Sequence, residues 1–199
     1  LERVPDSVRL LVMATPYKIT AEQAATLERR WKKDGRVIVF ANLPNTYESG
    51  ALSGVEITGM HVKRVSAARQ TTSRVTEAVP WEAWSGTLIG EPTDRSVALW
   101  EPDAKLPPLW PHPVIDDPSA VPLAFYAGSD NAASVAMKEM GDWTSVVTAV
   151  HSLKPAMWRA LLLKAGGHTW FAESEGTFEN PDVVEATDDF IMLISGKSA

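Results

Sequence analysis

Residues 8–41 read VRLLVMATPYKITAEQAATLERRWKKDGRVIVFA and combine two apolar runs with an amphipathic segment between them. The first run, residues 8–14, is nearly continuous, as in a strand buried on both faces. Thr20 then begins a capping box with Gln23 three residues later, which predicts the start of a helix. Residues 36–41 form the second apolar run. A strand, a helix and a strand in this span predict two parallel strands joined by a helical crossover.

The remainder of the chain is richer in strands. Gly- and Pro-containing segments break it into short apolar runs, and Pro155 begins a second amphipathic helix that ends at Gly166 or Gly167. Strands are predicted within residues 61–78, 86–100, 121–127, 133–139, 143–150, 168–171, 183–186 and 190–194. Residues 101–122 hold seven prolines and predict an irregular connection. Together these patterns predict an α/β fold with a parallel core and an antiparallel, strand-rich extension.

The length of 199 residues favours one domain. We expect residues 1–199 to form that domain, with an irregular strand-and-loop insertion at residues 60–120. The first residue is Leu1 rather than Met, which suggests a segment cut from a longer protein. The chain is too short for an eight-fold β/α barrel of about 250 residues.

The charge is uneven, with +5 in residues 1–74 and −11 in residues 75–199. A nucleic-acid partner requires a coherent basic face. The basic residues cluster only at the end of the first predicted helix, where a solvated face and the helix dipole account for them: Arg29, Arg30, Lys32, Lys33 and Arg36. No run approaches the roughly 20 apolar residues of a membrane span. We therefore expect neither a nucleic-acid nor a membrane partner, and the sequence does not distinguish a cytoplasmic, periplasmic or secreted location.

Motifs for common chemistries are missing from the sequence. There is no cysteine, no phosphate-binding glycine loop and no Gly-x-Ser-x-Gly elbow, and the histidines at 61, 112, 151 and 168 lack metal-ligand spacing. The acidic segment at residues 173–189 lacks EF-hand spacing and reads as a solvated rim. We predict no catalytic residue, no metal site and no cofactor.

Two short polar segments have structural interpretations. Asp116 and Asp117 are adjacent, so on an extended chain their carboxylates point in opposite directions and are poorly placed as an acid/base pair. An Asx-type turn before Pro118 is the favoured interpretation. Residues 128–130 read Gly-Ser-Asp between two predicted strands and indicate a hairpin turn.

The chain contains eight tryptophans. Trp31 and Trp158 lie on the apolar stripes of the predicted helices and are expected in the core. Four others occur in the middle of the chain near His112, and they are candidates for ligand binding: Trp81, Trp84, Trp100 and Trp110. Either they stack on carbohydrate or form a protein interface, or they fill gaps in a strand-rich subdomain.

Both ends of the sequence resemble the class I glutamine amidotransferase-like domain of bacterial β-galactosidases, in particular the trimerisation-type domain of family 42 glycoside hydrolases. The segments that carry the resemblance are residues 9–13, 19–23, 33–40, 52–57, 141–146, 153–155, 161–168 and 189–194. The resemblance extends over both ends, about half of the chain, and does not include residues 60–115. The resemblance implies a flavodoxin-like three-layer sandwich with a mainly parallel sheet.

The resemblance does not imply either parent activity. The amidotransferase reaction needs a cysteine and a His-x-Glu pair, which this chain lacks, and the glycosidase carboxylates belong to a barrel. We expect a non-catalytic accessory or oligomerisation domain of a larger carbohydrate-active, β-galactosidase-like bacterial protein. The alternative is a carbohydrate-binding module that uses the central tryptophans. The expected partners are the rest of its polypeptide, further copies of the chain and a glycan. A basic patch at Arg29, Arg30 and Lys33 would meet the acidic rim at 173–189.

Overall fold

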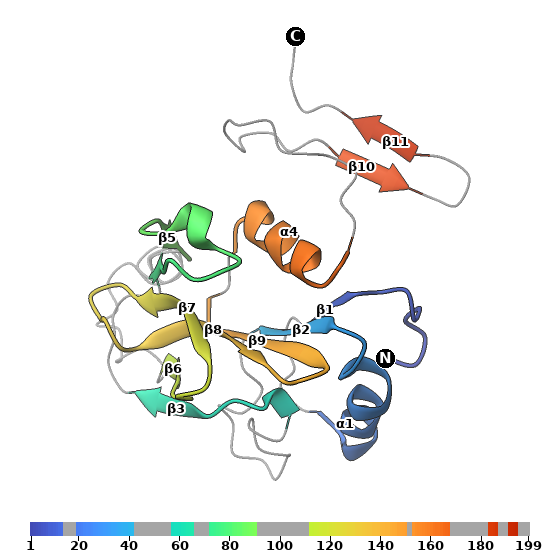
Figure 1. Ribbon diagram of the computed structural model, residues 1–199, viewed down its shortest axis with the longest axis horizontal. Coiled ribbons are helices and arrows are strands. Elements are labelled where there is room, and N and C mark those ends of the chain that lie inside the picture. Colours follow the sequence, from blue (N-terminus) through green and yellow to red (C-terminus); the bar gives the residue numbers. More distant parts are fainter. Residues whose placement is uncertain are drawn as a thin grey trace, which may run out of the picture. The chain divides into compact units, whose positions relative to one another are not determined.

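The computed structural model describes residues 1–13, 19–41, 57–65, 72–90, 112–150 and 153–167, and the backbone of two strands at 183–186 and 191–194. The chain divides into two compact units, residues 1–168 and 169–199. In chain order (Figure 1) the first unit contains β1 (Leu10–Met13), α1 (Ala21–Thr26), η1 (Leu27–Trp31), β2 (Arg36–Ala41), β3 (Val62–Val65), β4 (Ser73–Val75), η2 (Glu82–Trp84), β5 (Leu88–Ile89), β6 (His112–Ile115), β7 (Val121–Tyr126), β8 (Ala133–Glu139), β9 (Trp143–Thr148) and α4 (Pro155–Lys164).

The N-terminal strand–helix–strand prediction is confirmed. β1 and β2 are parallel, with Leu10 opposite Val37. Between them, the Thr20 side chain accepts from the Gln23 N–H while the Gln23 side chain accepts from the Thr20 N–H, which completes the capping box. The helix continues past α1 as the π-helical turn η1 and ends at Trp31. These local signals therefore placed the first three elements correctly.

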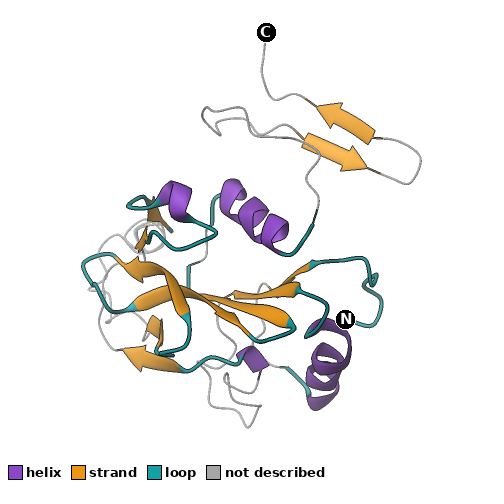
Figure 2. Ribbon diagram, viewed as in Figure 1, coloured by secondary structure: helices purple, strands orange, loops and turns teal. Residues whose placement is uncertain are grey.

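The nine-stranded sheet runs in the order β1-β2-β9-β8-β7-β4-β5, and β6 joins β3 to β8. β9 is parallel to β2, but β8, β7, β4 and β5 are all antiparallel to their neighbours. The β7–β8 pairing shifts register between Pro122 and Ala124, and again at Phe125. Such irregularities increase the local twist of a strand pair, and the sheet curls (Figure 2).

The expected flavodoxin-like three-layer sandwich is wrong. A doubly wound fold needs a helix between successive parallel strands, and the α-helical residues that the structure describes are the 6 of α1, the 10 of α4 and a short piece at residues 57–58. Tight turns at Gly128 and Gly141, both with φ of 83°, join β7 to β8 and β8 to β9, and such short connections enforce antiparallel pairing. The observed fold is a curled mixed sheet. Strand β6 also lies within the predicted irregular connection at residues 101–122.

Each face of the parallel region is covered by different elements (Figure 1). Val37 and Val39 of β2 belong to one core cluster, which includes Met157 and Leu161 of α4. Ile38 and Phe40 belong to the other, which includes Leu27 and Trp31 at the end of the first helix. The alternation along β2 therefore supplies side chains to both cores, as expected for a strand buried on both faces. No helix among the described residues is long and apolar enough to cross a lipid bilayer.

The second unit is described only as a two-stranded antiparallel sheet. β10 (Val183–Ala186) and β11 (Ile191–Ile194) pair with Val183 opposite Ile194. Both strands agree with the predicted closing strands, while the predicted strand at residues 168–171 lies outside the described residues.

Trp81 connects α4 to the sheet. Its side chain is 0% exposed and belongs to the core cluster on the α4 side. The indole N–H donates to the Met157 carbonyl of α4 at 3.3 Å. This tryptophan therefore fills the space between η2, α4 and the sheet, which is the gap-filling role considered for the central tryptophans.

Replacing Trp81 with alanine should lower the free energy of unfolding by about 3–5 kcal/mol, because the change leaves a large buried cavity. Trp84→Ala is the matched control: Trp84 is only partly buried against the same core, so its loss should be clearly smaller. Urea unfolding of both variants measures the difference. Equal losses would contradict the central position assigned to Trp81.

Candidate functional site

A buried carboxylate organises the connection between β6 and β7. Asp117 Oδ1 accepts hydrogen bonds from the Ser119 N–H at 3.0 Å and from the Ser119 hydroxyl at 2.6 Å. A carboxylate that bonds the backbone two residues later forms an Asx turn. The predicted Asx turn is confirmed, and it fixes the geometry of the segment around Pro118.

Asp117 Oδ2 binds two further parts of the chain. It accepts from Lys138 Nζ of β8 at 2.9 Å and from the His61 N–H at 3.2 Å. Lys138 Nζ also donates to the Gly59 carbonyl at 2.8 Å. The Asp117 side chain is 2% exposed and that of Lys138 is 20% exposed. The ion pair therefore holds the segment before β3 and the β6–β7 connection against β8.

Burial by itself would raise the pKa of Asp117, because it penalises the charged carboxylate. The hydrogen bonds from Ser119, Lys138 and His61 outweigh this penalty and hold the pKa well below its usual value of 3.8. Asp117 is therefore permanently ionised near neutral pH. A carboxyl group in this state cannot serve as a general acid.

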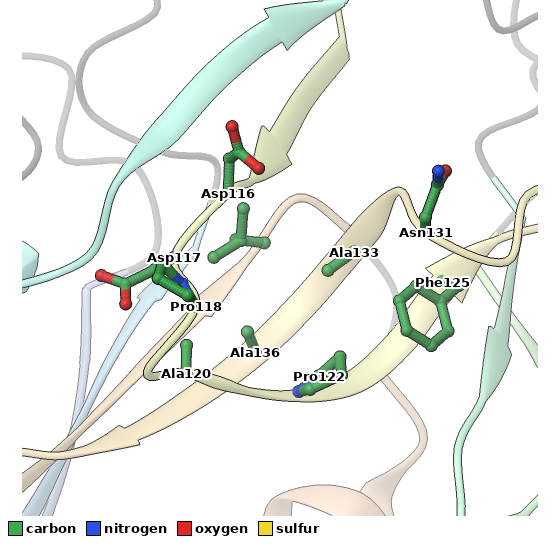
Figure 3. Close-up of a pocket in the computed structure, with 10 residues that line it drawn as sticks. Asp116, Asp117, Pro118, Ala120, Pro122, Phe125, Asn131, Ala133 and Ala136 are labelled. Carbon is green, nitrogen blue, oxygen red and sulfur yellow. The ribbon is translucent and has the colours of Figure 1, made fainter.

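A hollow of about 270 Å³ lies beside this connection (Figure 3). Its lining is mainly apolar and comes from β6, β7, β8 and their connections. The residues that line it are Ile115, Asp116, Asp117, Pro118, Ala120, Pro122, Phe125, Asn131, Ala133 and Ala136. Asp116 and Asp117 point in different directions (Figure 3), so they do not form the paired carboxylates of a glycosidase.

Two groups at this hollow remain chemically accessible. Asp116 is exposed and pairs with Lys63 Nζ through Oδ2 at 2.9 Å. Asn131 is exposed in the β7–β8 turn, where its Oδ1 accepts from the Ser129 hydroxyl at 3.1 Å. Among the residues that the structure describes, no three His, Asp or Glu side chains gather as metal ligands.

The tryptophan candidates differ in their surroundings. Trp81 is buried and offers no face to a ligand, and Trp84 is partly buried against the same core. Trp100 and Trp110 lie outside the described residues. His112 begins β6, and its side chain is likewise outside the description. Among these residues, only Trp84 is shown with a partly exposed ring.

Sequence reasoning did not identify the hollow. Phe125 lies in a predicted strand and Asn131 in a predicted turn, and only the packing of the chain brings them to one hollow. Lys138, near the end of another predicted strand, does not line the hollow but binds Asp117 in its wall. Lys138 carries a sequence signal for the ion pair. It follows the apolar run Ala133–Met137, and a lysine close to a buried strand is expected to have an anionic partner because an unpaired buried charge is costly.

The predicted basic patch is largely occupied by the N-terminal segment. The Arg30 guanidinium donates to the carbonyls of Leu1, Glu2 and Val4 and to Asp6 Oδ1, the last at 2.7 Å. Its hydrogen bond and its charge lower the pKa of Asp6 below the usual value. Arg29 pairs with Glu2 at 2.5 Å. The acidic rim proposed to meet this patch lies outside the residues whose side chains are described.

Comparison with known proteins finds structural likeness but no sequence relative. No family model and no curated protein match the chain. A polyextremophilic β-galactosidase from the Antarctic haloarchaeon Halorubrum lacusprofundi matches 82% of this chain with a TM-score of 0.50 and 18% identity. A β-galactosidase from Bacillus circulans sp. alkalophilus matches 89% with a TM-score of 0.53 and 14% identity. The chain spans 24% of the length of each.

These matches confirm the resemblance to part of a β-galactosidase at the level of the fold. They do not confirm the amidotransferase-like assignment. At 18% and 14% identity they carry no information on individual residues.

Replacing Asp117 with asparagine keeps the size of the side chain but removes its charge. The free energy of unfolding should fall by about 2–4 kcal/mol at pH 7, because Lys138 loses its counter-ion in a largely buried position. The neighbouring variant Asp116→Asn breaks an exposed pair and should cost about 0–1 kcal/mol. Denaturant unfolding of both variants tests the contrast.

The Asp117–Lys138 pair predicts how the free energy of unfolding changes with pH. A carboxyl with a lowered pKa in the folded state stabilises the fold above its unfolded pKa and loses this contribution as the pH falls. The stability gap between the original protein and Asp117→Asn should therefore be constant above about pH 5 and should narrow below about pH 4. A gap that stayed constant down to pH 2.5 would rule out this role of the Asp117 charge.

Proposed function

We propose that this chain is a non-catalytic accessory domain of a larger β-galactosidase-like protein, with a role in its assembly. The observation that carries the proposal is the asymmetry of coverage. The structural matches take in 82% and 89% of this chain but only 24% of either β-galactosidase. A chain that matches over most of its own length, but covers about a quarter of a longer protein, has the size expected of one domain of such a protein.

The chemistry of the described residues supports an accessory role. Asp117 is held ionised by its hydrogen bonds, and Asp116 is exposed beside Lys63. A glycosidase needs one carboxyl with a raised pKa and a second one facing it across the bond to be cleaved. The two aspartates of the hollow meet neither requirement.

The attachment of the N-terminal segment supports a role in assembly. Arg30 binds the backbone of the first residues and is itself only 17% exposed in its side chain. Arg36, buried beneath it, donates to the Asp6 carbonyl at 2.9 Å. A domain joined to this end of the chain would be held at a fixed position rather than on a loose tether.

The test compares the longer polypeptide that contains this chain with a version from which residues 1–199 are deleted. Sedimentation at low and high salt should show an oligomer for the first and protomers for the second. The 199-residue chain alone should show no hydrolysis of a nitrophenyl β-galactoside above buffer. An undiminished oligomer after deletion would refute the assembly role, and repurified activity in the chain alone would refute the non-catalytic one.

A further inference from the structure

The hollow beside the β6–β7 connection combines an apolar floor with a polar rim. Its floor is formed by small or rigid side chains of the β7–β8 region together with the ring of Phe125 (Figure 3): Ala120, Pro122, Ala133 and Ala136. Small side chains leave the space open, and the aromatic ring gives it one flat apolar wall. A concave apolar surface with a few polar groups at its edge is the usual form of a small-molecule site.

The rim offers one donor and one acceptor. The Ser129 hydroxyl binds Asn131 Oδ1, which orients the amide so that Nδ2 remains a donor. Lys63 binds Asp116 Oδ2, and Oδ1 of the same carboxylate has no partner among the described residues. Figure 3 shows Asp116 and Asn131 at the edge of the hollow. A ligand lying over Phe125 would therefore meet a carboxylate oxygen and an amide N–H.

The charges around the hollow are balanced. Asp116 is paired with Lys63 and Asp117 with Lys138, so the rim favours neither an anion nor a cation. Hydroxyl groups both donate and accept, and they match a rim that presents one group of each kind. The Asp117 carboxylate has its hydrogen bonds filled by protein groups and serves to hold the wall in place.

We propose that this hollow binds a single neutral sugar ring, with the C–H face of the ring on Phe125 and its hydroxyls on Asn131 and Asp116. The volume of about 270 Å³ lies just below the range of about 300–1,000 Å³ for drug-sized ligands, so it suits one ring rather than an oligosaccharide. This site is separate from the central tryptophans. It does not depend on the proposed accessory function.

The experiment titrates the isotope-labelled 199-residue chain with methyl β-galactoside, methyl β-glucoside and glycerol, and follows amide shifts by NMR. We expect saturable shifts at the Asn131 side-chain amide and around Phe125, with a Kd on the order of 1–10 mM for at least one glycoside. Glycerol has hydroxyls but no ring, so it should not saturate the site.

Three variants assign the binding. Asn131→Ala and Asp116→Ala should each weaken it by about threefold to tenfold, the value of one hydrogen bond. Phe125→Leu keeps an apolar side chain but removes the flat ring, and it should abolish saturation. Trp84→Ala is the control and should leave the affinity unchanged. The fold of each variant is checked by its backbone spectrum.

The possible outcomes separate the site from its alternatives. Loss of binding in Trp84→Ala but not in Asn131→Ala would move the ligand to the tryptophans and overturn the proposal. Absence of saturable shifts up to about 50 mM glycoside, well above the expected Kd, would overturn it as well. Equal binding of glycerol would show that no sugar ring is recognised. None of these results would affect the assembly test, which measures a different property.

Discussion

A single ionised carboxylate, that of Asp117, joins the parts of the chain that form the hollow. A charge removed from water is costly unless protein groups replace its hydrogen bonds. Asp117 meets this requirement with donors from its own turn, from His61 and from Lys138. Those donors come from segments far apart in the sequence, so satisfying the charge requires the segments to assemble correctly. These hydrogen bonds hold the β6–β7 connection and the segment before β3 in place against β8.

The strand pairing of the sheet changes from parallel to antiparallel at β9. On one side β9 pairs in parallel with β2, and on the other it pairs antiparallel with β8 through the turn at Gly141. All six residues of β9 are buried, so the strand belongs to both halves of the core. This arrangement explains why an N-terminal strand–helix–strand unit does not extend into a doubly wound fold. The hairpins occupy the edge where further parallel strands would otherwise add.

Local signals in the sequence were sufficient for individual elements. The Thr20–Gln23 box, Pro155 at the start of α4 and the Asx turn at Asp117 each involve groups within a few residues of one another. The fold class was missed because sheet order depends on pairings between distant strands. The hollow was missed for the same reason: Lys138 is 21 residues from its partner Asp117. The sequence does not decide whether Trp81 is buried, because its burial depends on packing against Met157, 76 residues away.

The contacts of Arg30 bear on how this chain can vary. Three of its hydrogen bonds go to main-chain carbonyls, those of Leu1, Glu2 and Val4, which every amino acid possesses. Hydrogen bonds to these carbonyls fix the path of the main chain and do not themselves depend on which side chains it carries. The route of the first residues over the domain is therefore fixed through their main chain, while Glu2 and Asp6 add ion pairs with Arg29 and Arg30 through their side chains. The forked guanidinium, whose geometry lysine does not reproduce, allows one side chain to hold several carbonyls at once.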